Sequence, residues 1–512
     1  MKQKTINNRN RKLFATFLMG NMLFYGMFFI NHYAGDTYFT EVCGYGDTFW
    51  QYWVNGRWIM SLSMALCKVF HVSFYIEKKL AWGFGMLALS SSSVVVYRLL
   101  ESRFLCWREE QRFSENEDGF SATLRSILLW LSAFLLISNV FTAEYFVFPE
   151  YTGVMCLGIF FSVSGAAFVL HFLKNGGTRF YVCGILLSII GISCYQGCFG
   201  IGILVMALCV DDLFKDVKRF FFCNIVMGSA YVIPGIVNML EAKIGGTTRS
   251  ASAGFDLAAS FQKATDGLIL LMKTTGTYLP NKVYVYFVLA AGGLLLVLLA
   301  LSRSWKAWAK AVYVGIITFL GIYTPLLATD IDGIDAAPRT VYIMGALIPI
   351  LCLLMIGAID RGGKKEPNKA KIRIVTALLG IFFIVQLVGD YRELADHYAA
   401  TQTDVYESTF VGLAIWNYEN ETGIPVKNIA IYEDISPQGF AVGGNAFGTT
   451  NCRALSVDWV VPYALELLGE RSLNRVDSSD EVYEEYFKDK NWIVMDSAQL
   501  VFIGDTLHFC IY

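Results

Sequence analysis

Charged residues and histidines are scarce in this chain. Asp, Glu, Lys and Arg make up 16% of its 512 residues, and five histidines are scattered along it. The sequence contains no HExxH pair, no nucleotide-binding phosphate loop and no GxSxG elbow, so nothing supports a soluble metalloprotease, ATPase or serine hydrolase. Most of the 12 cysteines lie in apolar stretches, where cysteine behaves as a small apolar residue, and no metal site is predicted.

Apolar residues are abundant instead. They form 55% of the chain, and apolar runs of roughly 20 residues recur, each long enough to cross a bilayer core. The pattern predicts a polytopic α-helical membrane protein with about 11 transmembrane helices. The predicted spans are 13–30, 80–100, 126–141, 151–172, 180–193, 197–210, 220–240, 283–301, 311–328, 341–358 and 374–389.

Lysine and arginine occur in alternate connecting segments. They gather in 2–12, 103–125, 174–179, 215–219, 303–310 and 361–371, which the positive-inside rule assigns to the cytoplasm. The N-terminus is therefore predicted to be cytoplasmic and the C-terminus extracytoplasmic. The first apolar run is longer than the core of a signal peptide and no small-residue cleavage site follows it, which indicates a retained anchor.

Two segments deviate from this pattern. Residues 59–75 are apolar but contain Lys68 and His71, and counting them as a span would invert every later loop. They are therefore predicted to form an interfacial or re-entrant helix. The apolar run 180–210 must cross twice if the basic segments on both sides are cytoplasmic. Its turn then places Tyr195 and Gln196 at an outer apex.

The composition changes near residue 390. Residues 1–389 are predicted to form the transmembrane bundle, and residues 390–512, with about 20 acidic and about 7 basic residues, a small extracytoplasmic α/β domain. This acidity argues against nucleic acid as a partner. Helices are predicted at 404–421 and 461–468, and strands at 428–432, 492–495, 500–503 and 507–512, with a hairpin turn at Gly504 and Asp505. A disulfide between Cys452 and Cys510 is left open.

The segment that follows the first span concentrates polar and aromatic side chains. Residues 32–58 are predicted to be an aromatic-rich loop at the outer membrane surface that holds Asp36, Asp47 and Arg57. The long outer segment 241–282 is predicted to contain an amphipathic helix. Carboxylates held at a boundary between water and membrane favour chemistry on a lipid-linked substrate. The other polar residues assigned to the outer side are Glu144, Glu150, Tyr195, Gln196, Asp330, Asp332, Asp335 and Arg339.

Four short sequence features of these outer segments together resemble those of a known protein family. They are an acidic segment directly after the first span, NGRW at 55–58, YQ at 195–196 and APR at 337–339. With them the chain resembles the Gtr-type glucosyltransferases of bacterial surface polysaccharides, within the GT-C class of polytopic membrane glycosyltransferases, and the likeness covers about residues 13–390. Family members often have paired acidic residues early in the first loop, whereas this chain has Gly35 followed by Asp36. The departure leaves open whether Asp36 or Asp47 is the general base.

The resemblance implies transfer of a sugar, glucose in that family, from a polyprenyl phosphate to a glycan acceptor outside a bacterial cytoplasmic membrane. The acceptor hydroxyl must lose its proton to a carboxylate, which implicates Asp36 first and Asp47 second. Arg57 and Arg339 are candidates for stabilising the departing phosphate. The remaining candidates for substrate contact are Trp58, Glu144, Tyr195 and Gln196. The implied partners are the lipid-linked donor, the surface glycan and membrane lipid; no cofactor is identified, and a role for a divalent cation is open.

Other interpretations of the same residues remain. Aspartates in Gly-Asp-Thr turns, as at positions 36 and 47, often bond only to neighbouring backbone amides, and arginines at the ends of spans often reach toward lipid phosphates. For the whole protein, the alternatives are a flippase or transporter of lipid-linked sugar and a noncatalytic subunit of a polysaccharide assembly complex. The predicted spans hold very few ionisable residues, which disfavours an ion-coupled transporter.

Overall fold

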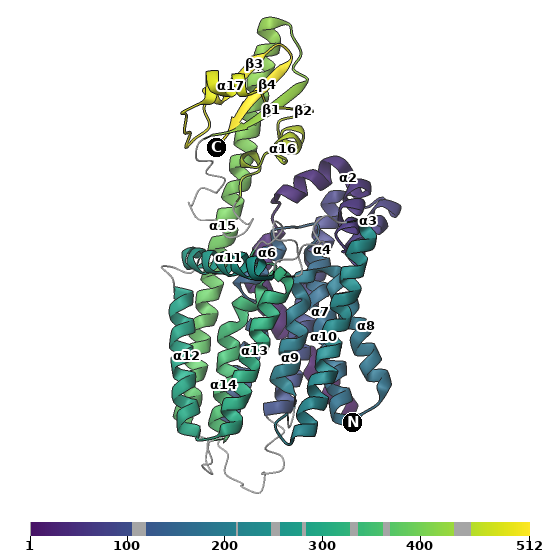
Figure 1. Cartoon of the computed structure of the whole chain (residues 1–512), viewed down its shortest axis with the longest axis vertical. Coiled ribbons are helices and arrows are strands. Elements are labelled where there is room, and N and C mark those ends of the chain that lie inside the picture. The colour runs from purple at the N-terminus through teal and green to yellow at the C-terminus, as the bar shows by residue number, and fades with distance from the viewer. Residues whose placement is uncertain are drawn as a thin grey trace.

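Figure 1 shows a computed structural model of the chain, which describes residues 2–104, 119–210, 213–246, 257–278, 283–327, 336–361, 369–434 and 452–512. Helices dominate, and a small sheet is confined to the C-terminal part. The start of helix α1 (Lys2–Tyr25) lies at the opposite end of the molecule from the C-terminal domain (Figure 1). The predicted combination of a helical bundle with a small C-terminal sheet is confirmed.

Eight of the described helices are long and apolar enough to cross a membrane, and each coincides with a predicted span. A ninth arises if α5 (Gly119–Ile137) and α6 (Val140–Phe146), which are bent by 46°, count as one. The eight are α1 with the 3₁₀ turn Gly26–Phe29, α4 (Phe74–Phe104), α7 (Thr152–Asn175), α10 (Val217–Gly245), α12 (Val283–Ser302), α13 (Trp305–Leu327), α14 (Leu347–Arg361) with the preceding 3₁₀ turn η6 (Tyr342–Ala346), and α15 (Lys369–Thr422).

The other two predicted spans are the shorter helices α8 (Thr178–Cys194) and α9 (Phe199–Cys209). Their 17 and 11 residues extend about 26 and about 17 Å, less than a hydrocarbon core of about 30 Å. Helix α8 packs closely on α7, because a Cβ added at Gly165 would lie 2.7 Å from the carbonyl oxygen of Gly184. Glycines at this contact let the two backbones approach, as in helix pairs within lipid.

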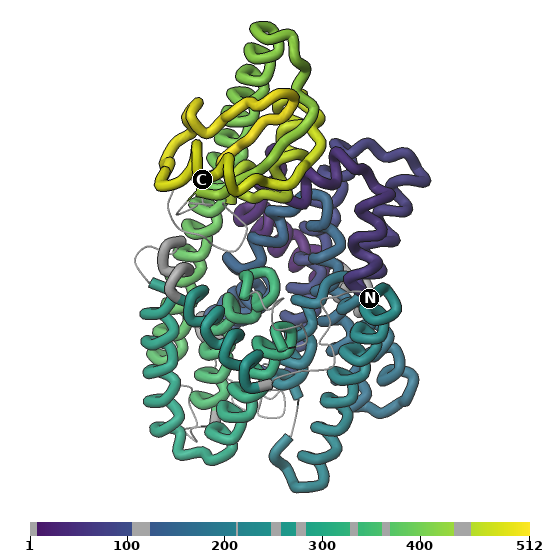
Figure 2. Tube along the Cα trace, turned by 45° about the horizontal axis from the view of Figure 1, so that its top comes forward, coloured from purple at the N-terminus to yellow at the C-terminus, as the bar shows by residue number. Residues whose placement is uncertain are grey.

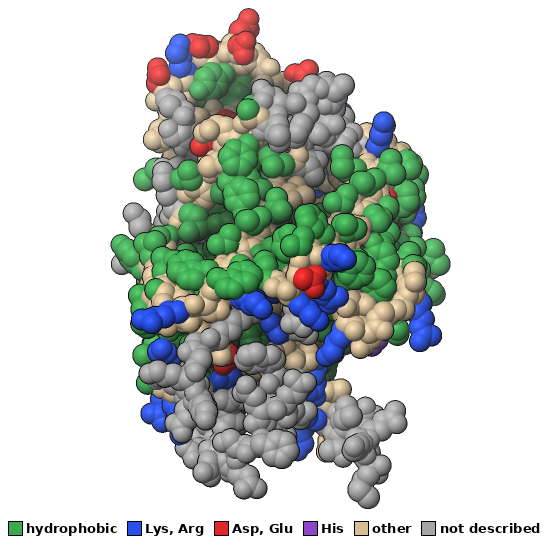
Figure 3. Space-filling view, turned by 60° about the horizontal axis from the view of Figure 1, so that its bottom comes forward, with side chains coloured by type: hydrophobic (Ala, Val, Ile, Leu, Met, Phe, Trp, Pro, Cys, Tyr) green, Lys and Arg blue, Asp and Glu red, His purple; other side chains and the backbone are tan. Residues whose placement is uncertain are grey.

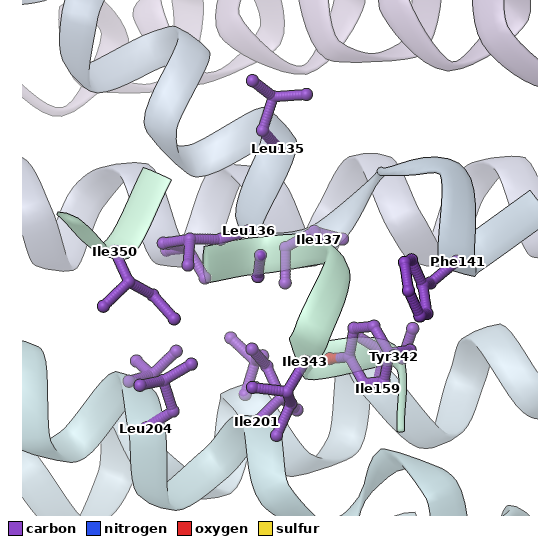
Figure 4. Packing of buried hydrophobic residues seen from close by; sticks show 14 of the residues in the cluster. Leu135, Leu136, Ile137, Phe141, Ile159, Ile201, Leu204, Tyr342, Ile343 and Ile350 are labelled. Atoms are coloured by element: carbon purple, nitrogen blue, oxygen red, sulfur yellow. The ribbon is translucent and has the colours of Figure 1, made fainter. Parts of the chain in front are cut away.

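One apolar core runs through the bundle. In Figure 4, Leu136 of α5, Ile201 and Leu204 of α9, and Ile343 of η6 come together from segments far apart in the sequence. All four side chains are buried. Their packing fixes α5, α9 and η6 relative to one another. Helix α6, which carries Glu144, follows α5 and contacts η6, which itself follows the 337–339 motif.

The bundle surface separates basic from apolar regions. Lys and Arg side chains gather at the end where α1 begins, with a band of apolar side chains next to them (Figure 3). An extensive exposed apolar surface suits lipid rather than water, which is compatible with a multi-pass membrane protein. Exposed apolar residues of the bundle include Phe221, Ile225, Leu289, Leu296, Val312, Ile316, Ile381 and Ile384.

Residues 35–54, predicted to be part of a loop, instead form helix α2 (Gly35–Val54). Asp36 and Asp47 therefore lie on a helix and not in Gly-Asp-Thr turns. The loop prediction was wrong because glycines and polar residues suggested a surface connector, whereas tertiary burial of one helical face overrides their weak helix propensity. The buried residues of α2 are Thr37, Tyr38, Thr40, Thr48 and Tyr52.

Two shorter predicted helices are present. Helix α3 (Trp58–Val69) occupies most of the segment predicted to be interfacial or re-entrant. Helix α11 (Leu257–Tyr278) lies across the ends of the long helices of the bundle (Figure 1). Leu268 and Leu271 of α11 are buried, and Phe261 stacks on Tyr323 of α13 with ring centroids 5.0 Å apart. Residues 247–256 of the same outer segment lie outside the described residues.

Helix α15 continues for 54 residues from the bundle into the C-terminal domain. The predicted domain boundary at 389–390 falls inside it, and the helix predicted at 404–421 is its last part. The sheet order is β2-β1-β4-β3, in which β1 (Asn428–Glu433) is parallel to β2 (Asn474–Val476) and β4 (Thr506–Ile511), and β3 (Leu500–Ile503) is antiparallel to β4. Helix α16 (Val461–Leu468) coincides with the predicted one.

Most strand predictions in this domain are confirmed, including the hairpin between β3 and β4, where Gly504 has a φ of 62°. The strand at 492–495 is wrong: the N–H of Trp492 donates to Asp434 Oδ2 at 2.9 Å, and Ile493 is exposed. Strand β2 was missed because three exposed residues show no apolar alternation. Cys452 and Cys510 both carry thiols, so the disulfide left open between them is not formed.

Candidate functional site

Asp36 lies in the first turn of α2, half-buried, where the Tyr52 hydroxyl donates to its Oδ2 at 3.5 Å. In a straight helix these residues, 16 positions apart, would be separated by about 24 Å. Helix α2 is broken at Gly44, whose φ of 78° is open to glycine but strained for other residues. The break folds the second half of α2 back, and this brings Tyr52 to Asp36.

The structure places Asp47 elsewhere. Its side chain is exposed and near Cys43 and Tyr463, the latter on α16 of the C-terminal domain. Asp36 is instead on the side that faces Tyr52 and Tyr151, whose rings meet edge to face at 4.6 Å. The two carboxylates predicted as alternative bases are therefore not part of one cluster, and only Asp36 lies among the other candidate residues.

Arg57 and Gln196, which are 139 positions apart, meet directly. Arg57 Nε donates to Gln196 Oε1 at 3.0 Å, and the Gln196 amide donates to the carbonyl of Asn55 at 3.0 Å. The guanidinium carbon lies 5.0 Å from the Tyr195 ring centroid and 5.7 Å from that of Tyr52. The NGRW and YQ motifs thus form one unit, and Tyr52 links Arg57 to Asp36.

Trp58 begins α3 directly after Arg57. Its ring stacks on Trp53 at the end of α2, with ring centroids 4.6 Å apart and planes 3° apart. The stack holds α2 and α3 together at the NGRW turn. Trp58 therefore lies beside the cluster and supports the turn that carries Arg57.

Arg339 and Glu144 form an ion pair. Arg339 Nη1 lies 2.7 Å from Glu144 Oε1, and the backbone N–H of Arg339 donates to Oε2 at 2.6 Å. The YQ motif packs directly against Arg339, because a Cβ added at Gly197 would lie 2.3 Å from the Arg339 carbonyl oxygen. Burial raises the pKa of Tyr195 to about 12, while the charges of Arg339 and Arg57 act in the opposite direction. Tyr195 is therefore close to both guanidinium groups.

Glu150, not proposed as a site residue from the sequence, lies next to Asp36. It is buried, and Thr37 Oγ1 donates to its Oε2 at 2.9 Å. Burial, and then the negative charge of Asp36, raise the pKa of Glu150 to about 8. At neutral pH the site holds a protonated carboxyl beside Asp36. The sequence signal was only that both residues fall in predicted outer segments, since nothing local shows that they meet.

Glu150→Gln is expected to remove a pH dependence of stability. The folded protein holds this proton up to about pH 8 whereas the unfolded chain releases it near pH 4.5, so stability falls as pH rises through that interval. Thermal unfolding of purified protein at about pH 5, 7 and 9 checks this. Glu150→Gln should match the wild type at the lowest pH and melt several degrees higher at the highest. A difference that is the same at every pH, or one also produced by Glu466→Gln at an exposed site, would contradict the assignment.

A second group of polar residues was also missed. Along one face of α15, side chains spaced three or four residues apart are buried, from Gln386 within the bundle to Asp404 at the C-terminal domain. The His397 ring lies 5.0 Å from that of His32, near the start of α2. Helical spacing was visible in the sequence, but a boundary at 390 divided the pattern. The residues are Gln386, Asp390, Glu393, His397, Thr401 and Asp404.

The described residues give no support to a metal centre. Within the described ranges, no group of three or more His, Cys, Asp or Glu side chains is placed to hold a metal ion. Asp330, Asp332 and Asp335 of the predicted outer inventory lie outside those ranges. Comparisons of the chain with protein-family models, with curated proteins and with solved structures find no match.

Proposed function

We propose that this chain is a membrane glycosyltransferase that moves a sugar, glucose by its resemblance, from a polyprenyl-phosphate donor to a surface glycan acceptor. The proposal rests on one observation: Tyr52 links the half-buried carboxylate of Asp36 to the guanidinium of Arg57 at the end of an apolar bundle remote from its basic end. Sugar transfer from a phosphate needs a base that takes the proton of the acceptor hydroxyl and a cation that stabilises the departing phosphate. Asp36 and Arg57 are placed to supply these two groups.

In this reaction Asp36 takes the proton from the acceptor hydroxyl. The acceptor oxygen forms a bond to the anomeric carbon, the bond from that carbon to the phosphate oxygen breaks, and the polyprenyl phosphate leaves with the electron pair. The configuration at the anomeric carbon inverts. Glu150, whose pKa is raised to about 8 by burial and then by the charge of Asp36, is the second carboxyl of the site and is not the proposed base.

Arg57 is a better candidate than Arg339 for the departing phosphate. The described hydrogen-bond partner of the Arg57 side chain is the neutral Gln196, so its charge is available to an anion. Arg339 is already neutralised by the buried Glu144 at 2.7 Å. Its role in the proposal is to shape the site around Tyr195, whose buried ring packs against Arg57 and Tyr145.

The proposed location is a bacterial cytoplasmic membrane. The basic end of the bundle would face the cytoplasm, and the Asp36 cluster and the C-terminal domain would face outward. This orientation places the cluster where a flipped lipid-linked sugar and a surface glycan can both reach it. Membrane lipid then covers the exposed apolar surface of the bundle.

Arg57→Gln is expected to lower transfer by roughly 10- to 100-fold, which corresponds to the loss of a charge-assisted hydrogen bond to the phosphate. Arg57→Lys should retain part of the activity, since it keeps the charge but loses the planar fork. The matched control is Arg475→Gln, because Arg475 is exposed and paired only with Asp458 at 2.7 Å in the described structure. Equal transfer by Arg57→Gln and the control would remove Arg57 from the mechanism.

The proposed function is tested by transfer from radiolabelled polyprenyl-phosphate glucose to surface glycan in membranes that contain the chain. Membranes without the chain give the background. Transfer above background establishes a glycosyltransferase. If no polyprenyl-phosphate sugar supports transfer while labelled lipid equilibrates between the two leaflets, the chain is a flippase; if neither occurs, a noncatalytic subunit is the better interpretation.

A further inference from the structure

Helix α2 lies between the bundle and the C-terminal domain. Figure 2 shows the C-terminal domain beside the start of α2, and α16 contacts α2. Gly35 approaches the domain so closely that a Cβ there would lie 3.0 Å from Val460 Cγ2. Further along α2, the Phe39 ring meets that of Tyr463 on α16 edge to face, with ring centroids 5.2 Å apart. The first turns of α2 are therefore packed directly against the C-terminal domain.

Tyr38 is inserted into the core of the C-terminal domain. Its fully buried ring belongs to the same apolar cluster as Val411 and Leu465. Its hydroxyl donates to Asp404 Oδ2 at 3.2 Å, and Asp404 Oδ1 accepts the backbone N–H of Ala454 at 2.7 Å. Asp404 therefore joins α2, α15 and the segment that precedes α16 in one hydrogen-bonded contact.

The opposite side of α2 is held by the bundle. Thr37 Oγ1 donates to Glu150 Oε2 at 2.9 Å, and Thr40 Oγ1 lies 2.6 Å from the Tyr151 hydroxyl. Successive helical residues are rotated by about 100°, so Tyr38 points away from Thr37 and Thr40, and Asp36 lies between the two held faces. The position of the Asp36 carboxylate depends on both contacts.

The Asp404 contact is itself supported by a buried ion pair. Arg453, the residue before Ala454, has its Nη1 at 2.7 Å from Glu407 Oε1, about one turn along α15 from Asp404. Both side chains of this pair are buried. The backbone N–H that Asp404 accepts is therefore held in place, which makes Asp404 a firm anchor for Tyr38.

We propose that the C-terminal domain is a positioning element of the catalytic centre, in which Tyr38 and Asp404 hold α2 so that Asp36 faces Tyr52 and the acceptor. The proposal rests on the proposed glycosyltransferase function and assigns a role to a domain that otherwise has no part in the reaction. Tyr38 and Asp404 are positioning residues, since neither touches the reacting atoms.

The test compares kcat and KM for transfer in membranes that contain full-length variants. Tyr38→Phe and Asp404→Leu are expected to lower kcat about tenfold with the donor KM unchanged, because the base is displaced while donor contacts remain. Asp404→Asn should stay within about twofold of the wild type, since its amide can still accept from Ala454 and pair with the Tyr38 hydroxyl. The matched control is Tyr418→Phe, which removes a 2.9 Å bond to the Gly504 carbonyl without touching α2.

A cross-link separates positioning from a loss of folding. Val460 Cγ2, where a cysteine would place its sulfur, is 3.0 Å from the Cβ position of residue 35, which suits a disulfide. Oxidation of Gly35→Cys/Val460→Cys should restore kcat to the Asp404→Leu variant and leave kcat unchanged when Asp404 is present.

Wild-type kcat in Tyr38→Phe and Asp404→Leu, or no recovery on cross-linking, would overturn the positioning role while the proposed function stands. Absence of transfer by the wild type would instead overturn the proposed function, and the positioning role with it.

Discussion

Asp36→Asn is expected to lower sugar transfer by roughly 10²- to 10⁴-fold while donor binding is retained, which is the usual contribution of a general base. Asparagine keeps the size and the contact with the Tyr52 hydroxyl at 3.5 Å but cannot take a proton at neutral pH. The loss should therefore appear in kcat rather than in donor KM. Initial rates at equal expression, with donor binding measured separately, check the prediction.

Asp47→Asn distinguishes the two aspartates identified from the sequence. Asp47 is exposed and lies near Tyr463, away from Tyr52 and Arg57. Transfer by Asp47→Asn is expected to stay within about twofold of the wild type, as for most surface changes. Asp458→Asn, at an exposed site paired with Arg475, controls for the substitution itself. Full activity in Asp36→Asn, or a large loss in Asp47→Asn, would reverse the assignment of the base.

Glu144→Leu is expected to destabilise the protein by about 3 to 5 kcal/mol, the usual cost of leaving one member of a buried ion pair without the other. The Glu144 side chain is 0% exposed and that of Arg339 is 19% exposed, so water compensates the cation poorly. The substitution also leaves the backbone N–H of Arg339 without its 2.6 Å acceptor. Thermal unfolding and the yield of monodisperse protein measure the effect.

The double variant Glu144→Leu/Arg339→Met tests whether disruption of the ion pair causes the loss of stability expected for Glu144→Leu. Removing both charges should recover part of the lost stability, because the double variant contains neither member of the ion pair. Transfer by the double variant reports separately on Arg339, whose position beside Tyr195 is otherwise held by Glu144. If Glu144→Leu alone melts like the wild type, the ion pair contributes nothing measurable and the site is held by apolar packing.

The fold class followed from the sequence because long apolar runs have few alternatives to membrane-length helices. Eight predicted spans coincide with helices of sufficient length, and the hairpin at Gly504 and Asp505 was found from its turn residues. The sequence failed where tertiary burial decided the local conformation. Residues 35–54 are a helix because one face packs between two domains, and 492–495 are not a strand because no described strand pairs with them.

The sequence by itself determined the helical, apolar character of the bundle, the small C-terminal sheet and the candidate residues Asp36, Arg57 and Gln196. These features could be predicted because they depend on local composition and on the spacing of residues along the chain. The tertiary structure alone decided which candidates meet. The break at Gly44 brings Tyr52 to Asp36, and Gln196 reaches Arg57 across 139 positions. Such contacts depend on how helices pack in three dimensions, which no short stretch of sequence records.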